Sequence, residues 1–124
     1  MNEERIEGKA VQKHLRKSAR KVRLIADAVR GKNVADALKK LKFTNKAAAK
    51  PVAKVIKSSA ANIRDKYQEE RFDDEDLVID EIYVNEGPTL KRMQPRAMGR
   101  ANIVRKRTCH VHVVVAKEQE LINQ

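Results

Sequence analysis

The chain has 124 residues, of which 41% are hydrophobic and 36% are charged, and its formal net charge is +11. This length fits one domain, residues 1–124, with a real but modest core. The sequence has no Trp and only 3% aromatic residues, which argues against a sheet that stacks single-stranded bases on aromatic rings. A charge of this size attracts polyanions, so nucleic acid is the leading partner and an anionic membrane surface the second.

The charge is unevenly distributed along the chain. Residues 1–64 carry a net charge of +13, residues 65–86 a net charge of −8 and residues 87–124 a net charge of +6. The single cysteine, Cys109, has no internal disulfide partner, which indicates a reducing compartment. The N-terminus lacks the apolar stretch of a secretory signal, and no apolar run is long enough to span a bilayer. We therefore expect a cytoplasmic protein with no membrane partner.

The first predicted elements are a strand and a helix. Residues 9–16, KAVQKHLR, roughly alternate and favour a short strand with Val11 and Leu15 on its buried face. SARKVRLIADAVRGK favours a helix with Ser18 as its N-cap and Gly31 as its left-handed C-terminal residue. Its core stripe consists of apolar residues at helical spacing, namely Val22, Ile25, Ala26 and Val29.

Two further helices are predicted. Asn33 can cap the short helix VADALKKLKF, whose apolar seam consists of Val34, Leu38 and Leu41. A third helix covers about residues 46–66, and Pro51 requires that this helix either starts later or is kinked in its first turns. One face of the third helix is apolar and another is basic; the apolar face consists of Val52, Val55, Ile56, Ser59 and Ile63.

An acidic loop follows at residues 68–77. Four of its carboxylates are adjacent in sequence, whereas a calcium loop needs alternate ligands, a turn glycine and a distal glutamate. These four residues are Asp73, Asp74, Glu75 and Asp76. We therefore expect a solvated loop without a metal ion.

Two strands follow the acidic loop. Residues 77–84 alternate imperfectly, which predicts a bulge, whereas residues 108–115 alternate regularly. The residues on the buried face of the second strand are Cys109, Val111, Val113 and Val115. The order of elements predicts an α+β fold, in which three helices pack on a small antiparallel sheet. The globular body would comprise about residues 9–84 and 108–117.

The two strands are joined by residues 85–107, which we expect to form a long protruding β-hairpin. Within it, residues 87–107, GPTLKRMQPRAMGRANIVRKR, include seven Lys or Arg and no Asp or Glu. Arms of about ten residues at ~3.3 Å per residue would project on the order of 30 Å. Such a ribbon cannot be held by its own contacts. It therefore needs an anionic partner or stays mobile.

An enzyme is not favoured by any constellation of residues. The best candidate metal site is Cys109-His110-x-His112, but alternation in a strand puts Cys109 on the face opposite the histidines. Two histidines fall short of the three or four ligands of a zinc site. We therefore expect no catalytic residue, no metal and no cofactor. A basic architectural DNA- or RNA-binding protein with a β-arm is one function that the charge and the hairpin allow.

Three segments together resemble one known family. They are SARKVRLIADAVRGK, SSAAN and GPTLKRMQPRAMGRANIVRKRTCHVHVVV. In this order, over about residues 8–117, they resemble the large-subunit ribosomal protein twenty-two family in its bacterial-type form. Ala19 stands where the family often has proline.

The resemblance implies a structural constituent of the large ribosomal subunit that binds rRNA across several domains, supports assembly and takes part in translation. Its implied partners are large-subunit rRNA, neighbouring ribosomal proteins and, near the hairpin tip, the nascent polypeptide and tunnel-binding antibiotics. No homo-oligomer is expected.

The resemblance also implies roles for individual residues. The residues that would contact rRNA are Arg16, Lys17, Arg20, Arg23, Lys91, Arg92, Arg96, Arg100, Arg105, Lys106, Arg107 and His110. The tip residues that would line the polypeptide exit tunnel are Met93, Gln94, Pro95, Arg96, Ala97, Met98 and Gly99.

Overall fold

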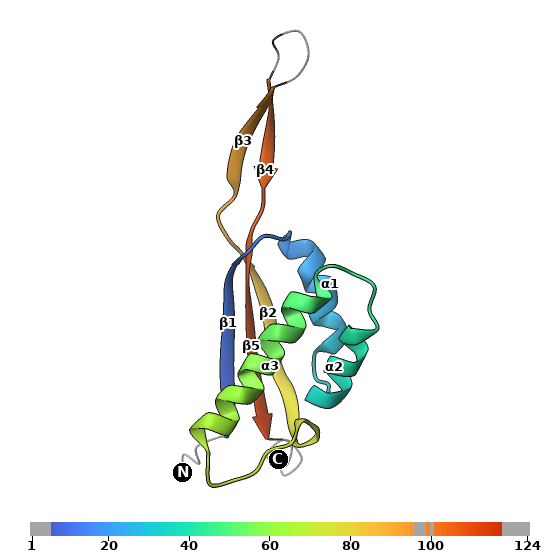
Figure 1. The fold of residues 1–124 in the computed structure, drawn as a ribbon, viewed down its shortest axis with the longest axis vertical. Helices are drawn as coiled ribbons and strands as arrows, with labels where there is room; N and C mark the ends of the chain where they lie inside the picture. The colour runs from blue at the N-terminus through green and yellow to red at the C-terminus, as the bar shows by residue number, and fades with distance from the viewer. Residues whose placement is uncertain (1–5, 96–98, 100, 118–124) are drawn as a thin grey trace.

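The computed structural model describes residues 6–95, 99 and 101–117 and confirms the α+β fold with a long hairpin (Figure 1). The elements in chain order are β1 (Glu7–Leu15), α1 (Ala19–Val29), α2 (Val34–Lys42), α3 (Ala49–Lys66), the 3₁₀ turn η1 (Asp74–Asp76), β2 (Leu77–Glu86), β3 (Leu90–Pro95), β4 (Ala101–Lys106) and β5 (Cys109–Lys117). None of the helices in this part of the chain is both long and apolar enough to cross a membrane.

The body is built on a three-stranded antiparallel sheet in the order β1-β5-β2. The regular alternation predicted for β5 is confirmed, because Cys109, Val111, Val113 and Val115 are all buried. The predicted bulge in β2 is also present, as a register shift between Ile79 and Glu81. The shift moves the buried side chains from odd to even positions: Leu77 and Ile79 before it, Ile82 and Val84 after it.

The predicted buried face of β1 is wrong at Val11. Val11 is 47% exposed, whereas Gly8 is buried against α3. A Cβ on Gly8 would lie 2.6 Å from the Ser59 carbonyl oxygen of α3, so only glycine permits this packing distance. An irregularity between Gln12 and Leu15 then returns Leu15 to the core side, where it is partly buried.

The helices carry the predicted core. The stripe of α1 is fully buried, and the Asn33 side chain caps α2 by accepting the Ala35 N–H. Ser18 is the N-cap of α1 as predicted, but its side chain makes no capping hydrogen bond. Of the two alternatives raised by Pro51, a later start is correct, because α3 begins at Ala49 and the proline lies in its first turn. The five predicted residues of the apolar face of α3 are all buried.

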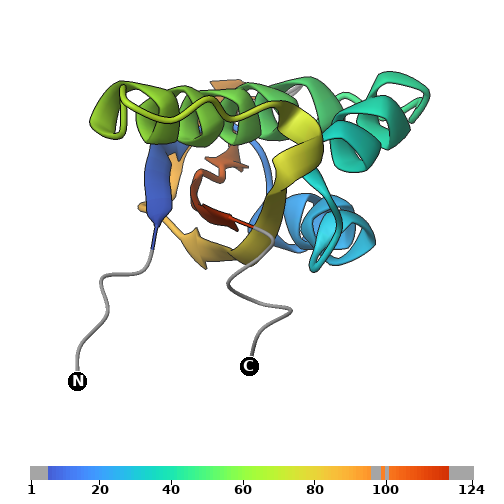
Figure 2. The ribbon, with the colours of Figure 1, turned by 90° about the horizontal axis from the view of Figure 1, so that it is seen from below.

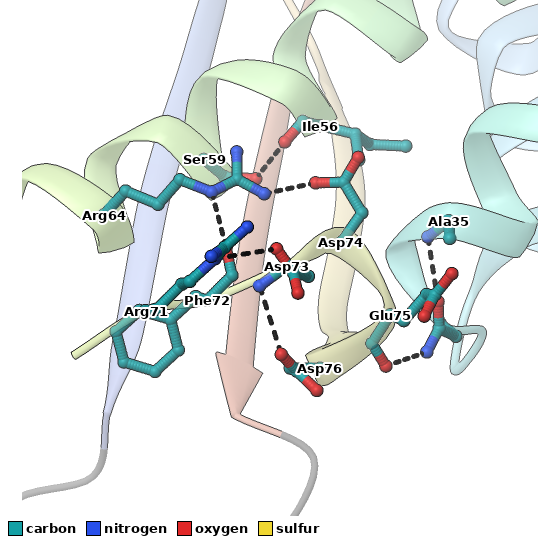
Figure 3. Close-up of polar contacts among 11 residues, drawn as sticks. Ala35, Ile56, Ser59, Arg64, Arg71, Phe72, Asp73, Asp74, Glu75 and Asp76 are labelled. Atoms are coloured by element: carbon teal, nitrogen blue, oxygen red, sulfur yellow. Dashed lines mark hydrogen bonds and ion pairs between the residues drawn. The ribbon is translucent and has the colours of Figure 1, made fainter.

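The acidic segment is held by hydrogen bonds, although most of its side chains are exposed as predicted (Figure 3). Arg64 of α3 donates to the Phe72 carbonyl at 2.8 Å and to the Asp74 carboxylate. Asn33 donates from its side-chain amide to the Glu75 carbonyl. The segment therefore connects the end of α3 to the start of α2, at the end of the body remote from the hairpin (Figure 1).

Candidate nucleic-acid interface

The base of the hairpin is a close junction between the two strands that lead into it. The Gly87 N–H donates to the Thr108 carbonyl at 2.9 Å, and the Thr108 hydroxyl donates to the Pro88 carbonyl at 2.6 Å. A Cβ on Gly87 would lie 2.6 Å from the Thr108 hydroxyl and 3.2 Å from His110 Nε2. These contacts determine where the hairpin leaves the body, and they need glycine at position 87.

The hairpin is a separate two-stranded sheet of β3 and β4, which extends away from the body (Figure 1). Lys91 lies directly opposite Arg105, and Leu90 lies opposite Lys106. Like charges in opposite positions destabilise an antiparallel pair. Met93 is 72% exposed, so this side chain contributes no core to the ribbon. An anionic partner beside these cations would remove the repulsion.

The tip is described only in part. Pairing of the arms ends at Pro95 and Ala101, and the described tip residues Met93, Gln94, Pro95 and Gly99 are all exposed. Gly99 has a φ of +72°, which suits glycine in a turn. The predicted site residues that lie outside the described part are Arg96, Ala97, Met98 and Arg100. For Arg92 the structure describes the backbone alone.

Two adjoining grooves lie between the N-terminal end of α1 and the hairpin base. They bring together seven of the predicted rRNA-contacting residues, from three separate parts of the sequence, and add Lys21, which the prediction omitted. The cations that line the grooves are Arg16, Lys17, Arg20, Lys21, Lys91, Arg105, Lys106 and Arg107. Glu86 is the acidic residue among the lining residues. We call this region the α1–hairpin grooves.

The N-terminus of α1 adds to the positive potential of the α1–hairpin grooves. Ser18 and Ala19 line them, the Ser18 side chain leaves the first-turn N–H groups uncapped, and the first turn holds no acidic residue. A helix N-terminus carries partial positive charge and free N–H donors, which together suit a phosphate. The arrangement is therefore suited to a polyanion.

Arg23 has a contact that sequence reasoning missed. It donates from Nε and Nη2 to the Val84 carbonyl of β2, at 3.1 and 3.0 Å. Arg30, the C-cap of α1 about two turns further along, donates from Nη2 to the Ile82 carbonyl at 2.7 Å. β2 is an edge strand of the sheet, so these two arginines satisfy carbonyls that would otherwise be open to another chain. No pattern in the sequence indicated this pairing.

His110 also has a structural contact. Its Nδ1 accepts the His14 N–H at 3.0 Å, and the two rings meet edge to face with centroids 4.9 Å apart. His14 has a φ of +56°, an uncommon value for a residue other than glycine.

Cys109 lies on the opposite, buried face of β5 as predicted, and burial raises the pKa of its thiol. No group of three potential metal ligands is found within the described ranges.

A second basic surface covers α2 and α3, and the sequence alone predicts no role for it. Its exposed lysines are Lys39, Lys40, Lys42, Lys46, Lys50, Lys54 and Lys57. Lys32 lies beside Lys40, and this neighbouring lysine lowers the pKa of Lys40. Phe43, at the end of α2, is 75% exposed among these cations.

A family model and several curated relatives match most of this chain. Residues 10–116 match the family model described as ribosomal protein L22p/L17e. The chain belongs to the ribosomal protein L22 family. It is 52% identical over 114 residues to the large ribosomal subunit protein uL22 of Desulfitobacterium hafniense. The matched region covers 92% of this chain and 97% of that protein. The uL22 of Pediococcus pentosaceus is 48% identical over 120 residues, covering 97% of this chain and 99% of the relative.

Membership of the L22 family confirms the resemblance stated from the sequence. It also confirms that the chain is a ribosomal protein, which functions in translation, and that it is not an enzyme. The match extends from β1 through the hairpin to β5, so it includes the α1–hairpin grooves and both arms of the ribbon.

Proposed function

We propose that this chain is a structural component of the large ribosomal subunit and that it binds large-subunit rRNA through the α1–hairpin grooves and the hairpin arms. The observation that carries the proposal is the convergence of eight cations and a helix N-terminus on one junction, with a single acidic residue among them. Family membership supports it, because the relatives are named as proteins of the large ribosomal subunit. Neighbouring ribosomal proteins would be its other partners.

The test of rRNA binding is its salt dependence. If about six to ten phosphates are neutralised, affinity for a large-subunit rRNA fragment should fall roughly 10³- to 10⁵-fold between 50 and 200 mM salt. Replacing Arg20, Arg105 and Arg107 by alanine should flatten the salt slope. Arg71→Ala is the matched control, because Arg71 lies beside Asp73 in the acidic segment. A salt-independent affinity would contradict the proposal.

We further propose that the hairpin tip, residues 93–99, lines the polypeptide exit tunnel beside nascent chains and tunnel-binding antibiotics. The projection of the ribbon and the exposure of Met93 support this assignment. Lys91, Arg92 and Arg96 would anchor the loop to rRNA, whereas Met93 and Met98 would shape the lumen, since methionine tolerates varied contacts.

Shortening the tip by three residues tests the tunnel assignment. The altered subunits should assemble, because the core lies elsewhere, and their sensitivity to macrolide-type inhibitors should change. Alanine at Lys91, Arg92 and Arg96 should instead remove density for the tip in a map of the subunit. Unchanged drug sensitivity and unchanged nascent-chain pausing in well-assembled particles would exclude the tunnel role.

A further inference from the structure

One face of the three-stranded sheet lies away from the helices. α3 covers the other face, and α1 lies along the β2 edge (Figure 2). The open face has exposed apolar and aromatic side chains, with Val11 47% and Tyr83 45% accessible. In the described part of the chain no helix covers these two side chains. We call this surface the open sheet face.

Rings gather on the open sheet face. The strand register places Val11, His112 and Tyr83 in one row across β1, β5 and β2. The Tyr83 and His112 rings are stacked, with centroids 4.6 Å apart and an interplanar angle of 9°. His110 lies two residues along β5, with the His14 ring against it. All three histidines and one of the two tyrosines in the sequence are therefore brought to one region.

The stacked pair is bordered by cations on both sides. On the β2 side, Arg23 and Arg30 bind the carbonyls of the residues directly after and before Tyr83. On the β1 side, Lys9 is exposed and lies on the same face as Val11 by strand alternation. The nearby carboxylates are Glu81, one row away from Tyr83, Asp27, which pairs with Arg30, and Glu7, 3.8 Å from Lys9. Three cations around one pair of rings suit an anionic ligand that also stacks.

We propose that Tyr83 and His112 form a stacking site for an unpaired RNA base, with the bordering cations holding the adjacent phosphates. Each ring of a stacked pair keeps one face free of the other, and Tyr83 lies on the edge strand with almost half of its surface exposed. Unstacked RNA bases are recognised by stacking on tyrosine and histidine rings. This site rests on the proposed rRNA binding and adds a base-stacking contact to it.

A protein segment fits the open sheet face less well than RNA. Strand addition would use the outer edge of β1, where Lys9 and Lys13 are exposed and the chain is irregular between Gln12 and Leu15. Edge lysines and bulges oppose such pairing. The low aromatic content predicts no stacking sheet, but histidine rings also stack on bases. The tertiary structure places His112 against Tyr83, which composition alone does not reveal.

The test uses the full chain and the rRNA fragment of the salt titration. Tyr83→Val and His112→Val introduce a β-branched residue, which suits a strand, at each position and remove the stack. Loss of one stacked base should lower affinity roughly 5- to 150-fold without changing the salt slope, since no phosphate contact is lost. Tyr83→Phe should retain affinity. Leu24→Ala, which removes a 58% exposed apolar side chain from α1, is the matched control.

Two further readouts identify the ligand. In NMR spectra, the ring resonances of Tyr83 should shift when RNA binds. Those of Tyr67, whose ring lies near Phe72, should not shift. A photo-crosslinker at position 83 in assembled subunits should attach to rRNA. Full affinity of both valine variants with a normal salt slope would overturn the stacking site and leave the proposed function standing, and so would a crosslink to a ribosomal protein. A flat salt slope would instead overturn the proposed function.

Discussion

Arg23 on α1 donates two hydrogen bonds to the Val84 carbonyl oxygen on β2, from Nε at 3.1 Å and from Nη2 at 3.0 Å. Together with Arg30 it protects the edge of the sheet next to the hairpin base. Arg20, three residues earlier, lines the α1–hairpin grooves. Two arginines of one helix thus have different surroundings, and this difference can be tested.

We expect Arg23→Ala to lower the free energy of unfolding by about 1 kcal/mol, because a carbonyl of an edge strand loses its charged donor. Arg20→Ala should change stability by less than about 0.5 kcal/mol, as is usual for an exposed side chain, and should weaken rRNA binding. Urea unfolding and filter binding measure the two quantities. Equal stability of both variants would mean that Arg23 has no structural role.

Gly8→Ala tests the contact between β1 and α3. The added Cβ would lie 2.6 Å from the Ser59 carbonyl oxygen and 2.9 Å from the Ile63 nitrogen, and both atoms belong to the helix backbone. Overpacking against backbone should cost about 3 kcal/mol. Gly31→Ala is the control, because its Cβ meets nothing within 4 Å and only its φ of +76° resists substitution. That variant should cost about 1 kcal/mol, and a smaller loss for Gly8→Ala would show that α3 can move away.

Lys91→Gln should have opposite effects on the free and the bound hairpin. Removing the charge opposite Arg105 relieves cross-strand repulsion, so amide hydrogen exchange in β3 should slow in the free protein. The same change removes one phosphate contact, so the salt slope for rRNA should decrease by about 0.7 to 0.9. Lys91→Arg should preserve both properties. Faster exchange in Lys91→Gln would show that the repulsion is unimportant.

Replacing residues 90–106 by a short Asn-Gly turn should leave the body folded. The hairpin sheet is separate from the body sheet, and the Gly87–Thr108 junction remains. The thermal midpoint should change by less than about 2 °C, whereas Val55→Ala, at a buried site, should cost about 1–3 kcal/mol. A large decrease in the midpoint of the shortened protein would show that the hairpin stabilises the body.

The pH dependence of stability should reveal the buried thiol. Burial raises the pKa of Cys109 above its ordinary value of about 9, and the Arg23 charge opposes the shift. Below pH 9 the thiol is neutral in both states; above it the unfolded chain releases the proton first, so stability decreases as pH rises. Cys109→Ala should therefore show a shallower decline above pH 9 in urea titrations. Identical declines would mean that the thiol does not contribute.

The sequence by itself determined most of the elements and the family. Helical and strand periodicity identified the buried stripe of α1 and the buried face of β5, because the period of side chains follows directly from backbone geometry. The bulge in β2 was visible as a break in alternation. The basic hairpin was evident from charge and length, and the family from its motifs.

Tertiary structure decided what depends on neighbours from distant parts of the chain. Val11 is exposed because β1 turns Gly8 toward α3, a close approach that alternation cannot show. Arg23 binds a carbonyl 61 residues away, and only the packing of α1 along an edge strand puts that oxygen within reach. The stacking of His112 on Tyr83 depends on the register of β5 against β2. Register is set by the combined packing of the whole sheet, so local sequence does not reveal it.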